Sequence, residues 1–451
     1  MADVSVAAAM TDAEKRKMYK RILWRLIGGI GLIYFFFGFD NLLVSYAALT
    51  MRADLNITDT FYGVIRSTGY LAALIFQIPY NVIIKKVGAR ALLPTASLIW
   101  SFTSVFLFFA TSPVHVALSR FLNGIGDAGF FVCVMYWITL WLPSRERASF
   151  TSIYIALGAV TAIFGSPLCG YIVDNVNWMG YAGWRWLFLI PSSMSVVISL
   201  IGFAVIRNKP EDAKWLSDKE KAIIREDLDY EKKLLEEKDA VPPTTKESIN
   251  KLLKHPALWM LGFMYFFAQM GMNTANGWGT MIIQDFAPGL TGTMIAYISA
   301  PSALLSLFFS VSVGASSDKR KERKWHTLLP LICAAACYFL FLLPVGLWPK
   351  IIVLSVLGAF GGSSWYGPYW TLPPALLPPE TVNIAIAIIC CMSSLAGFSG
   401  NLLGGRISER FGSNGLLVFI GGAIVISIVL GFMLNYKKVA EVDKGNTADA
   451  T

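Results

Sequence analysis

Twelve apolar runs of about 20 residues each constrain the fold of this chain more than any other feature. A helix of that length crosses roughly 30 Å of hydrocarbon, so each run is long enough for one membrane span. Six runs precede one long charged segment and six follow it. The sequence therefore predicts an all-α membrane protein with twelve transmembrane helices in two pseudo-symmetric six-helix bundles. The expected spans are 22–50, 59–84, 91–111, 113–142, 149–173, 184–206, 257–284, 291–315, 327–346, 350–375, 382–405 and 413–435.

Two short basic turns indicate an internal repeat. Residues 85–90 join the second and third spans, and residues 314–323 join the eighth and ninth, the same position in the second half. Parallel repeats of this kind are typical of secondary transporters, in which two halves move about a site near the midplane. The predicted units are an N-terminal tail (1–21), an N-terminal six-helix bundle (22–206), a linker (207–255), a C-terminal six-helix bundle (256–436) and a C-terminal tail (437–451).

The linker is strongly polar but carries one helix signal. Ser217 and Glu220 have the spacing of a capping box, and Ile223 and Ile224 follow as an apolar side. We expect one surface helix that rests this side against the membrane, within an otherwise solvated segment.

The positive charges are distributed unevenly across the predicted membrane. Of the 38 Lys and Arg residues, 30 lie in the two tails and in the loops on their side. Cytoplasmic loops carry such an excess, so both termini are expected in the cytoplasm. The same placement accounts for the net charge of +9 without a nucleic-acid partner.

Enzyme and metal chemistry find no support in the sequence. It contains no nucleotide-binding loop and no nucleophile elbow, and its three His residues lie at span edges. The six Cys residues lie inside apolar spans without C-x-x-C spacing, so we interpret them as core residues. With 55% hydrophobic and 15% charged residues, the chain is too apolar for an ordinary soluble protein. We therefore expect no enzyme activity, no metal and no cofactor.

Four charged residues lie deep within the apolar spans: Asp40, Arg66, Arg120 and Asp127. A charge at bilayer depth costs several kcal/mol, so each is a candidate functional residue. Arg120 and Asp127 are almost two helical turns apart, which places them on one face of the fourth span. They could line one cavity, where movement of the arginine relative to the acid would change the protonation of the acid. The alternative for each acid is a static ion pair that joins the first and fourth helices.

A set of short strings, most of them in the first half, carries a family resemblance. The strings are YKRILWR (19–25), YAALTM (46–51), RFLNG (120–124), DAGFF (127–131), TLWLPSRERA (139–148) and AKWLS (213–217). Together with the six-plus-six layout and the basic turns, they resemble the major facilitator superfamily. Within it, the chain is similar to the anion:cation symporter family, whose members take up hexuronates, galactonate, tartrate, phthalate-type and related organic acids with protons.

The resemblance implies roles for the charged residues. The family's first span usually reads Tyr-x-Asp-Arg-x-Asn, with the Asp in proton coupling and the Arg on a substrate carboxylate. This chain keeps Asp40 but has Asn41 in place of the arginine. Asp127 stands at the family's fourth-span acid, usually Glu, and Arg120 matches the arginine seven residues before it. We expect Asp40 and Asp127 to carry the coupled proton. Because the first-span arginine is missing, the resemblance leaves the identity of the substrate open.

Arg66 is our candidate for the missing cation. At 1.5 Å per residue, it lies about 11 Å below the end of the second span, and position 41 lies about 13 Å below the same end of the first. At that depth Arg66 could bind the substrate anion. Two alternatives remain open, because Arg66 could instead extend to the outer headgroups or pair with Asp40 structurally.

The second half is expected to supply polar and aromatic walls, although aromatic side chains more often pack than contact a ligand. Spans seven to twelve contain no strongly placed cation. This favours a substrate with one dominant anionic group, although two arginines could hold a diacid. The candidate substrate-binding residues are Asn41, Arg66, Arg120, Gln269, Asn273, Trp278, Tyr366, Ser393 and Ser394.

The sequence thus favours a transporter that imports a small organic anion by proton symport with alternating access. The anion would be a carboxylate such as a sugar acid, a dicarboxylate or an aromatic acid. We expect a functional monomer in the lipid bilayer of a bacterial inner membrane, with the proton as coupling ion. The alternatives are an organic-anion exchanger or effluxer, a uniporter, and a transporter-like sensor that signals through the linker.

Overall fold

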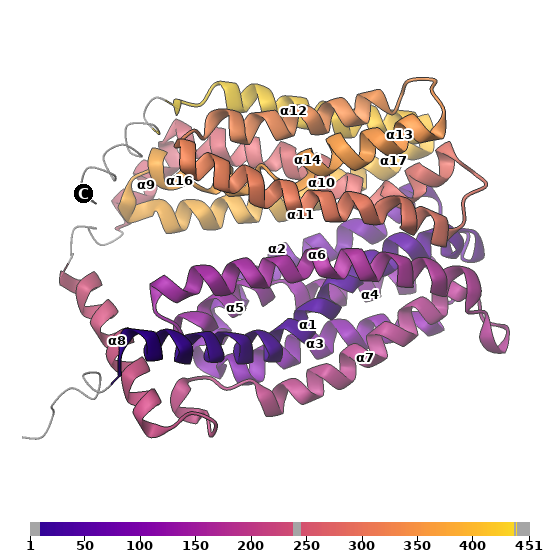
Figure 1. The fold of residues 1–451 in the computed structure, drawn as a ribbon. Helices are drawn as coiled ribbons and strands as arrows, with labels where there is room; N and C mark the ends of the chain where they lie inside the picture. The colour runs from indigo at the N-terminus through magenta and orange to yellow at the C-terminus, as the bar shows by residue number, and fades with distance from the viewer. Residues whose placement is uncertain (1–9, 238–244, 437–438, 440–451) are drawn as a thin grey trace, which may run out of the picture.

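The computed structural model describes residues 10–237, 245–436 and 439, and within them every long element is a helix (Figure 1). Two bundles of helices lie side by side, one from each half of the chain. The first contains α1 (Asp12–Asp54), α2 (Asp59–Val87), α3 (Ala89–Phe106), α4 (Pro113–Asp127), α5 (Phe130–Thr139), α6 (Ser144–Asn175) and α7 (Gly183–Val205). The second contains α10 (Pro256–Phe286), α11 (Gly292–Arg320), α12 (Lys324–Leu340), α13 (Leu347–Val353), α14 (Ala359–Ser363), α15 (Tyr366–Trp370), α16 (Leu372–Leu376) and α17 (Val382–Phe432).

The helices reproduce the predicted membrane architecture. Nine helical runs among the described residues are long and apolar enough to cross a membrane. The helix α17 counts as one of these runs, but it contains two helices joined at Gly412, whose φ is +63°. With α10, α12 and the second part of α17, the described chain has the twelve expected spans. Large apolar side chains such as Phe106, Phe164 and Phe308 are exposed on the spans, as lipid contact requires.

Two spans are less regular than the sequence predicts. The fourth breaks at Ala128 and Gly129, between α4 and α5. The tenth is divided among α13 to α16 and includes a π-helical turn at Leu354–Gly358. Local breaks of this kind are typical of helices that border a functional cavity.

The first helix begins earlier than expected. Thr11 caps α1, and its side chain exchanges hydrogen bonds with Glu14 in a capping box. The predicted N-terminal tail is therefore helical from residue 12, because a capped amphipathic turn extends the span on its polar side. Residues 1–9, and the predicted C-terminal tail apart from Val439, lie outside the described residues.

The linker contains two helices, α8 (Asp218–Glu237) and α9 (Lys246–Lys254), where the sequence predicts one. The predicted capping box is present, since the Ser217 amide donates to Glu220 over 3.0 Å. The expected membrane contact is wrong: Ile223 and Ile224 are fully buried in a core cluster with residues of the first bundle, including Tyr19 and Trp141. The second helix was missed because Thr245 caps a run of only nine residues.

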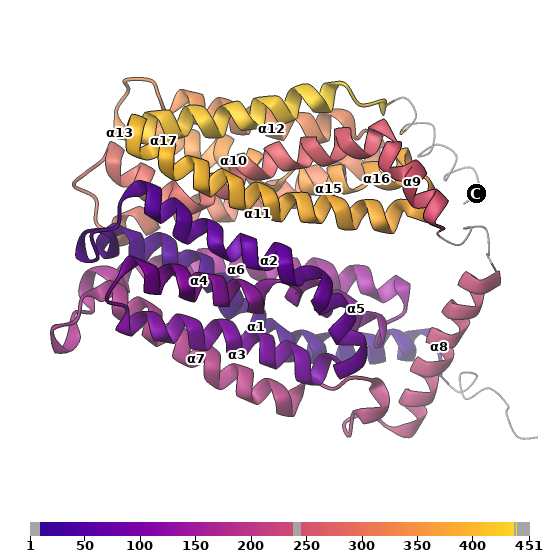
Figure 2. The same ribbon diagram turned by 180° about the vertical axis from the view of Figure 1, so that it is seen from behind.

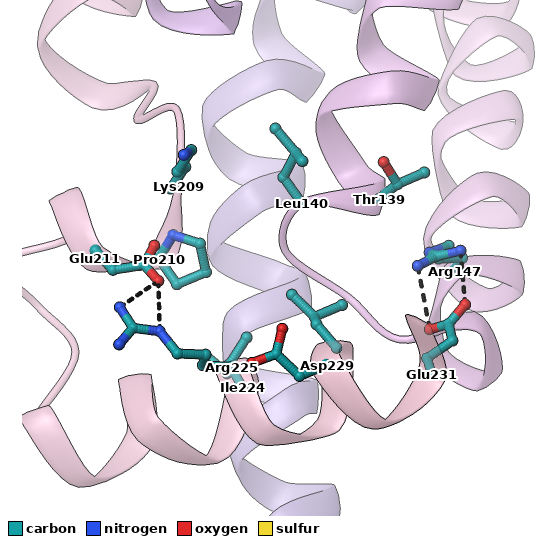
Figure 3. Close-up of a pocket in the computed structure, with 11 residues that line it drawn as sticks. Thr139, Leu140, Arg147, Lys209, Pro210, Glu211, Ile224, Arg225, Asp229 and Glu231 are labelled. Atoms are coloured by element: carbon teal, nitrogen blue, oxygen red, sulfur yellow. Dashed lines mark hydrogen bonds and ion pairs between the residues drawn. The ribbon is translucent and has the colours of Figure 1, made fainter. Parts of the chain in front are cut away.

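Ion pairs fix α8 to the first bundle (Figure 3). Arg147 at the start of α6 lies 3.1 Å from Glu231. The Ser144 amide donates to the same carboxylate over 3.0 Å. Beside them, Arg225 lies 3.0 Å from Glu211. A carboxylate at a helix N-terminus is favourable, so Glu231 also stabilises the start of α6.

The two bundles meet along three helix pairs: α2 with α17 (Figure 2), α6 with α11 (Figure 1), and α1 with α10. Among the described residues, the inter-bundle hydrogen bonds lie in the half of the molecule farther from the termini, which we call the distal end. There the Thr60 amide donates to Glu409 over 2.8 Å, and the Tyr62 hydroxyl donates to the Gly277 carbonyl over 2.9 Å. The distal end is thus closed in this structure.

Candidate substrate site

A cavity of about 620 Å³ lies between the two bundles. Side chains from α1, α2 and α6 line it on one side. Side chains from the second bundle line it on the other, from α10, α11, α12, α14, α15 and α17. Most of its polar groups are hydroxyls and amides. They belong to Asn41, Ser45, Tyr46, Tyr70, Ser166, Asn273, Asn276, Thr280, Ser299, Ser302, Ser306, Tyr338, Ser363 and Tyr366.

Arg66 is the one charged side chain among the described residues that line this cavity. It is only 4% exposed, and its Nε and Nη1 have no hydrogen-bond partner in the described part of the chain. A methyl group built on Gly277 would lie 2.9 Å from Nε of Arg66 and 2.7 Å from Oδ1 of Asn401. The guanidinium therefore lies against α10 and α17 of the second bundle, in neither of the alternative positions considered from the sequence.

Asp40 pairs with Arg120, and both are buried. The other oxygen of Asp40 accepts hydrogen bonds from Ser104 over 3.0 Å and from Asn123 over 2.9 Å. This network joins α1, α3 and α4 within the first bundle, and none of these four side chains lines the cavity. Arg120 is thus held by an acid on another helix, not by Asp127 on its own face.

Asp127 is the last residue of α4, next to the break in the fourth span. Its side chain is half-buried, and Oδ1 is buried with no hydrogen-bond partner among the described residues. A buried polar atom without a partner is costly, which is typical of a functional position. Asp127 does not line the cavity.

Of the six candidates in the second bundle, two line the cavity. Tyr366 and Asn273 line the cavity, and the Tyr366 hydroxyl donates to Gln269 over 2.7 Å. Gln269 in turn donates to Ser393 over 3.1 Å, so these two residues stand behind Tyr366. Trp278 is 1% exposed and packs edge-on against Tyr62, which makes it a core residue. Ser394 is half-buried and outside the cavity lining.

The sequence reasoning missed most of the small hydroxyl residues in the cavity. Ser299, Ser302 and Ser306 lie at intervals of three and four residues on α11, which is one face of a helix. That spacing is visible in the sequence, but serine is also common in the packing of membrane helices, so the pattern alone is ambiguous.

Close packing of α2 on α4 positions Arg66 and the Asp40 network relative to each other. A methyl group built on Gly124 would lie 2.2 Å from the Gly69 carbonyl oxygen. We expect Gly124→Ala to lower the free energy of unfolding by about 1–3 kcal/mol, because the helices must move apart. Thermal unfolding in detergent measures this. Gly28→Ala is the control, since a methyl group there meets nothing within 4 Å. An equal loss of stability in the two variants would contradict the prediction.

Two apolar helical bundles around a polar cavity, with the bundles in contact at one end, define a membrane transporter and not an enzyme. Residues 30–401 match the family described as the Major Facilitator Superfamily. The chain belongs to this superfamily.

Known proteins of similar sequence and structure agree with that assignment. A protein of Agrobacterium vitis with a provisional name as a tartrate transporter is 28% identical, and the match covers 94% of this chain and 93% of the relative. A quinolone resistance transporter of Acinetobacter baumannii is 26% identical over 97% of this chain and 98% of its own. The solved structure of a bacterial homologue of the human lysosomal transporter Spinster, inward-facing and occupied, superposes with a TM-score of 0.72 at 18% identity, covering 92% of this chain and 96% of that chain.

Proposed function

We propose that this transporter imports a small organic anion by proton symport with alternating access. The observation that carries the proposal is Arg66, a cation in the cavity lining whose buried Nε and Nη1 have no partner among the described residues. An unpaired buried charge is strongly disfavoured, so the site favours a ligand that brings the opposite charge. A guanidinium binds a carboxylate with two parallel hydrogen bonds, which suits an organic acid.

Asp40 and Asp127 are the proposed proton sites. Asp40 lies beside a competing cation, Arg120, so a small movement of that arginine would change the charge state that the site favours. Asp127 has a buried oxygen with no partner among the described residues, which a proton could occupy. Neither acid lines the cavity, so in this proposal both act on the anion through helix movement.

The proposed orientation places both termini in the cytoplasm of a bacterial cell. The excess of Lys and Arg on the side of the termini supports this orientation. The distal end then faces outward, and its closed contacts correspond to a state closed to the outside. The protein is proposed to work as a monomer, because one chain supplies both walls of the cavity.

We expect Asp127→Asn to abolish uphill accumulation while leaving exchange intact, because the amide cannot carry a proton. The purified protein is reconstituted into vesicles, a pH gradient is imposed, and uptake of gluconate, tartrate and benzoate is measured. Counterflow exchange in the same vesicles controls for folding. If the Asp127→Asn variant still accumulates an acid with the pH gradient, Asp127 does not carry the coupled proton.

The same vesicles separate the alternatives for the unaltered protein. A symporter accumulates an acid only with the proton gradient, and an exchanger requires the acid inside. A uniporter equilibrates the acid without accumulation, and a sensor moves none of the three.

A further inference from the structure

The number of charged side chains around the cavity limits the charge of the ligand that it can bind. Of the described residues that line it, Arg66 alone is charged. Arg120 lies outside the lining and is neutralised by Asp40. Lys350 is also outside it, with its Nζ 3.7 Å from the ring centre of Phe286. The described wall therefore offers one positive charge to a ligand.

The rest of the polar wall is neutral and can both donate and accept hydrogen bonds. Serine hydroxyls come from α1, α6, α11 and α14, and asparagine amides come from α1 and α10. Such groups satisfy the hydroxyls of a ligand, which likewise donate and accept. They compensate poorly for a second carboxylate, because an ion that leaves water needs an opposite charge.

We infer that the cavity selects a singly charged acid whose remaining polar groups are hydroxyls, and that it discriminates against the dicarboxylate of the same chain length. This inference rests on the proposed function, since it specifies the anion that Arg66 would bind. One carboxylate binds the guanidinium, and the hydroxylated chain extends toward the serines of α11 and the asparagines of α10. A second carboxylate would lie among those neutral groups.

Asn41 is the position at which this selectivity can be changed. It lines the cavity from α1, and its side chain is exposed there. An arginine at this position adds a second cation without altering Arg66. We therefore expect Asn41→Arg to improve the binding of diacids relative to monoacids. Asn41→Gln lengthens the side chain without adding a charge, so the ratio of diacid to monoacid affinity should not change.

The test titrates two matched pairs of acids, together with benzoate and hexanoate, into the purified full chain. Threonate is compared with tartrate and gluconate with glucarate, by calorimetric titration at neutral pH and constant ionic strength. We expect at least one hydroxylated monoacid to bind, and to bind about tenfold or more tightly than its diacid, which corresponds to about 1.4 kcal/mol. Asn41→Arg should reduce that ratio.

Each outcome decides a different point. A diacid that binds as tightly as its monoacid overturns the inference, and so does an unchanged ratio in Asn41→Arg. Binding of benzoate or hexanoate with none of the four hydroxylated acids overturns the inference but leaves the proposed function standing. Absence of binding by every acid, in protein that unfolds cooperatively, rejects the proposed function itself.

Discussion

Replacing Arg66 with glutamine is expected to weaken binding of the organic acid at least about 100-fold while leaving thermal stability unchanged or higher. The binding loss follows because each hydrogen bond to a charged group contributes about 1.5–3 kcal/mol, and 1.4 kcal/mol is a factor of ten. Stability does not fall because Nε and Nη1 of Arg66 have no partner among the described residues, so the substitution removes an uncompensated buried charge. Arg66→Lys should bind with intermediate affinity, since it keeps the charge without the planar fork.

Arg120→Gln provides the contrast. Arg120 is buried and paired with Asp40, so its removal leaves a buried carboxylate without its cation. Such a loss costs about 3–5 kcal/mol, which thermal unfolding of the detergent-solubilised protein detects. The double variant Asp40→Asn with Arg120→Gln should recover part of that loss, because neither charge then remains.

The two arginines therefore have opposite expected signatures in the same pair of measurements. If Arg66→Gln were strongly destabilised, Arg66 would have a structural partner in the folded protein. If Arg120→Gln lost binding without losing stability, the substrate would contact the Asp40 network and not Arg66. The second result would place the anion site inside the first bundle, at the network that joins α1, α3 and α4.

The architecture was largely predictable because a membrane leaves few options for an apolar chain. Backbone groups in hydrocarbon must bond within a helix, so length and hydropathy alone define the spans. Interruptions inside a span have weaker signals. The break at Gly129 and the π-helical turn at Leu354–Gly358 depend on packing against other helices. The hydropathy pattern of a span is the same whether or not its helix is broken.

The charged residues inside the spans could be found from sequence, but their partners could not. Asp40, Arg66, Arg120 and Asp127 stand out because charges are rare in apolar spans. Which acid meets Arg120 depends on how the helices are rotated about their axes, and in the structure it is Asp40 on the first span. The hydroxyl wall was missed for another reason, since serine on a membrane helix serves packing as often as binding.

Removing the carboxylate of Asp174 is expected to shift the transporter toward a state that is open at the distal end. Asp174 lies at the end of α6 and accepts three hydrogen bonds from the other bundle, all at the start of α11. The donors are the amides of Gly292, over 3.0 Å, and of Thr293, over 2.7 Å, and the Thr293 hydroxyl, over 2.6 Å. A helix N-terminus favours negative charge, so this contact stabilises the closed distal end in particular.

Asp174→Ala should change the conformational equilibrium about 30-fold, for a loss of about 2 kcal/mol of inter-bundle interaction. Asp174→Asn should have a smaller effect, because the amide keeps one acceptor oxygen without the charge. Spin labels at Met179 and Trp348, which are exposed on the two bundles, report the separation of the distal ends by electron paramagnetic resonance. We expect a population at longer distance that grows from the original protein to Asp174→Asn to Asp174→Ala.

Asp54→Ala is the matched control, because it removes a carboxylate from the same end without touching the contact between bundles. Asp54 accepts a hydrogen bond from Trp184 over 2.8 Å and lies 3.7 Å from Arg185, and both partners belong to its own bundle. A contact shifts a conformational equilibrium only by the difference in its interaction free energy between the two states. Asp54 keeps its partners when the bundles separate and should shift nothing, whereas Asp174 loses all three donors. Equal distance distributions for the two alanine variants would mean that the α6–α11 contact does not set the equilibrium, and that the closed state depends instead on the packing of α2 against α17.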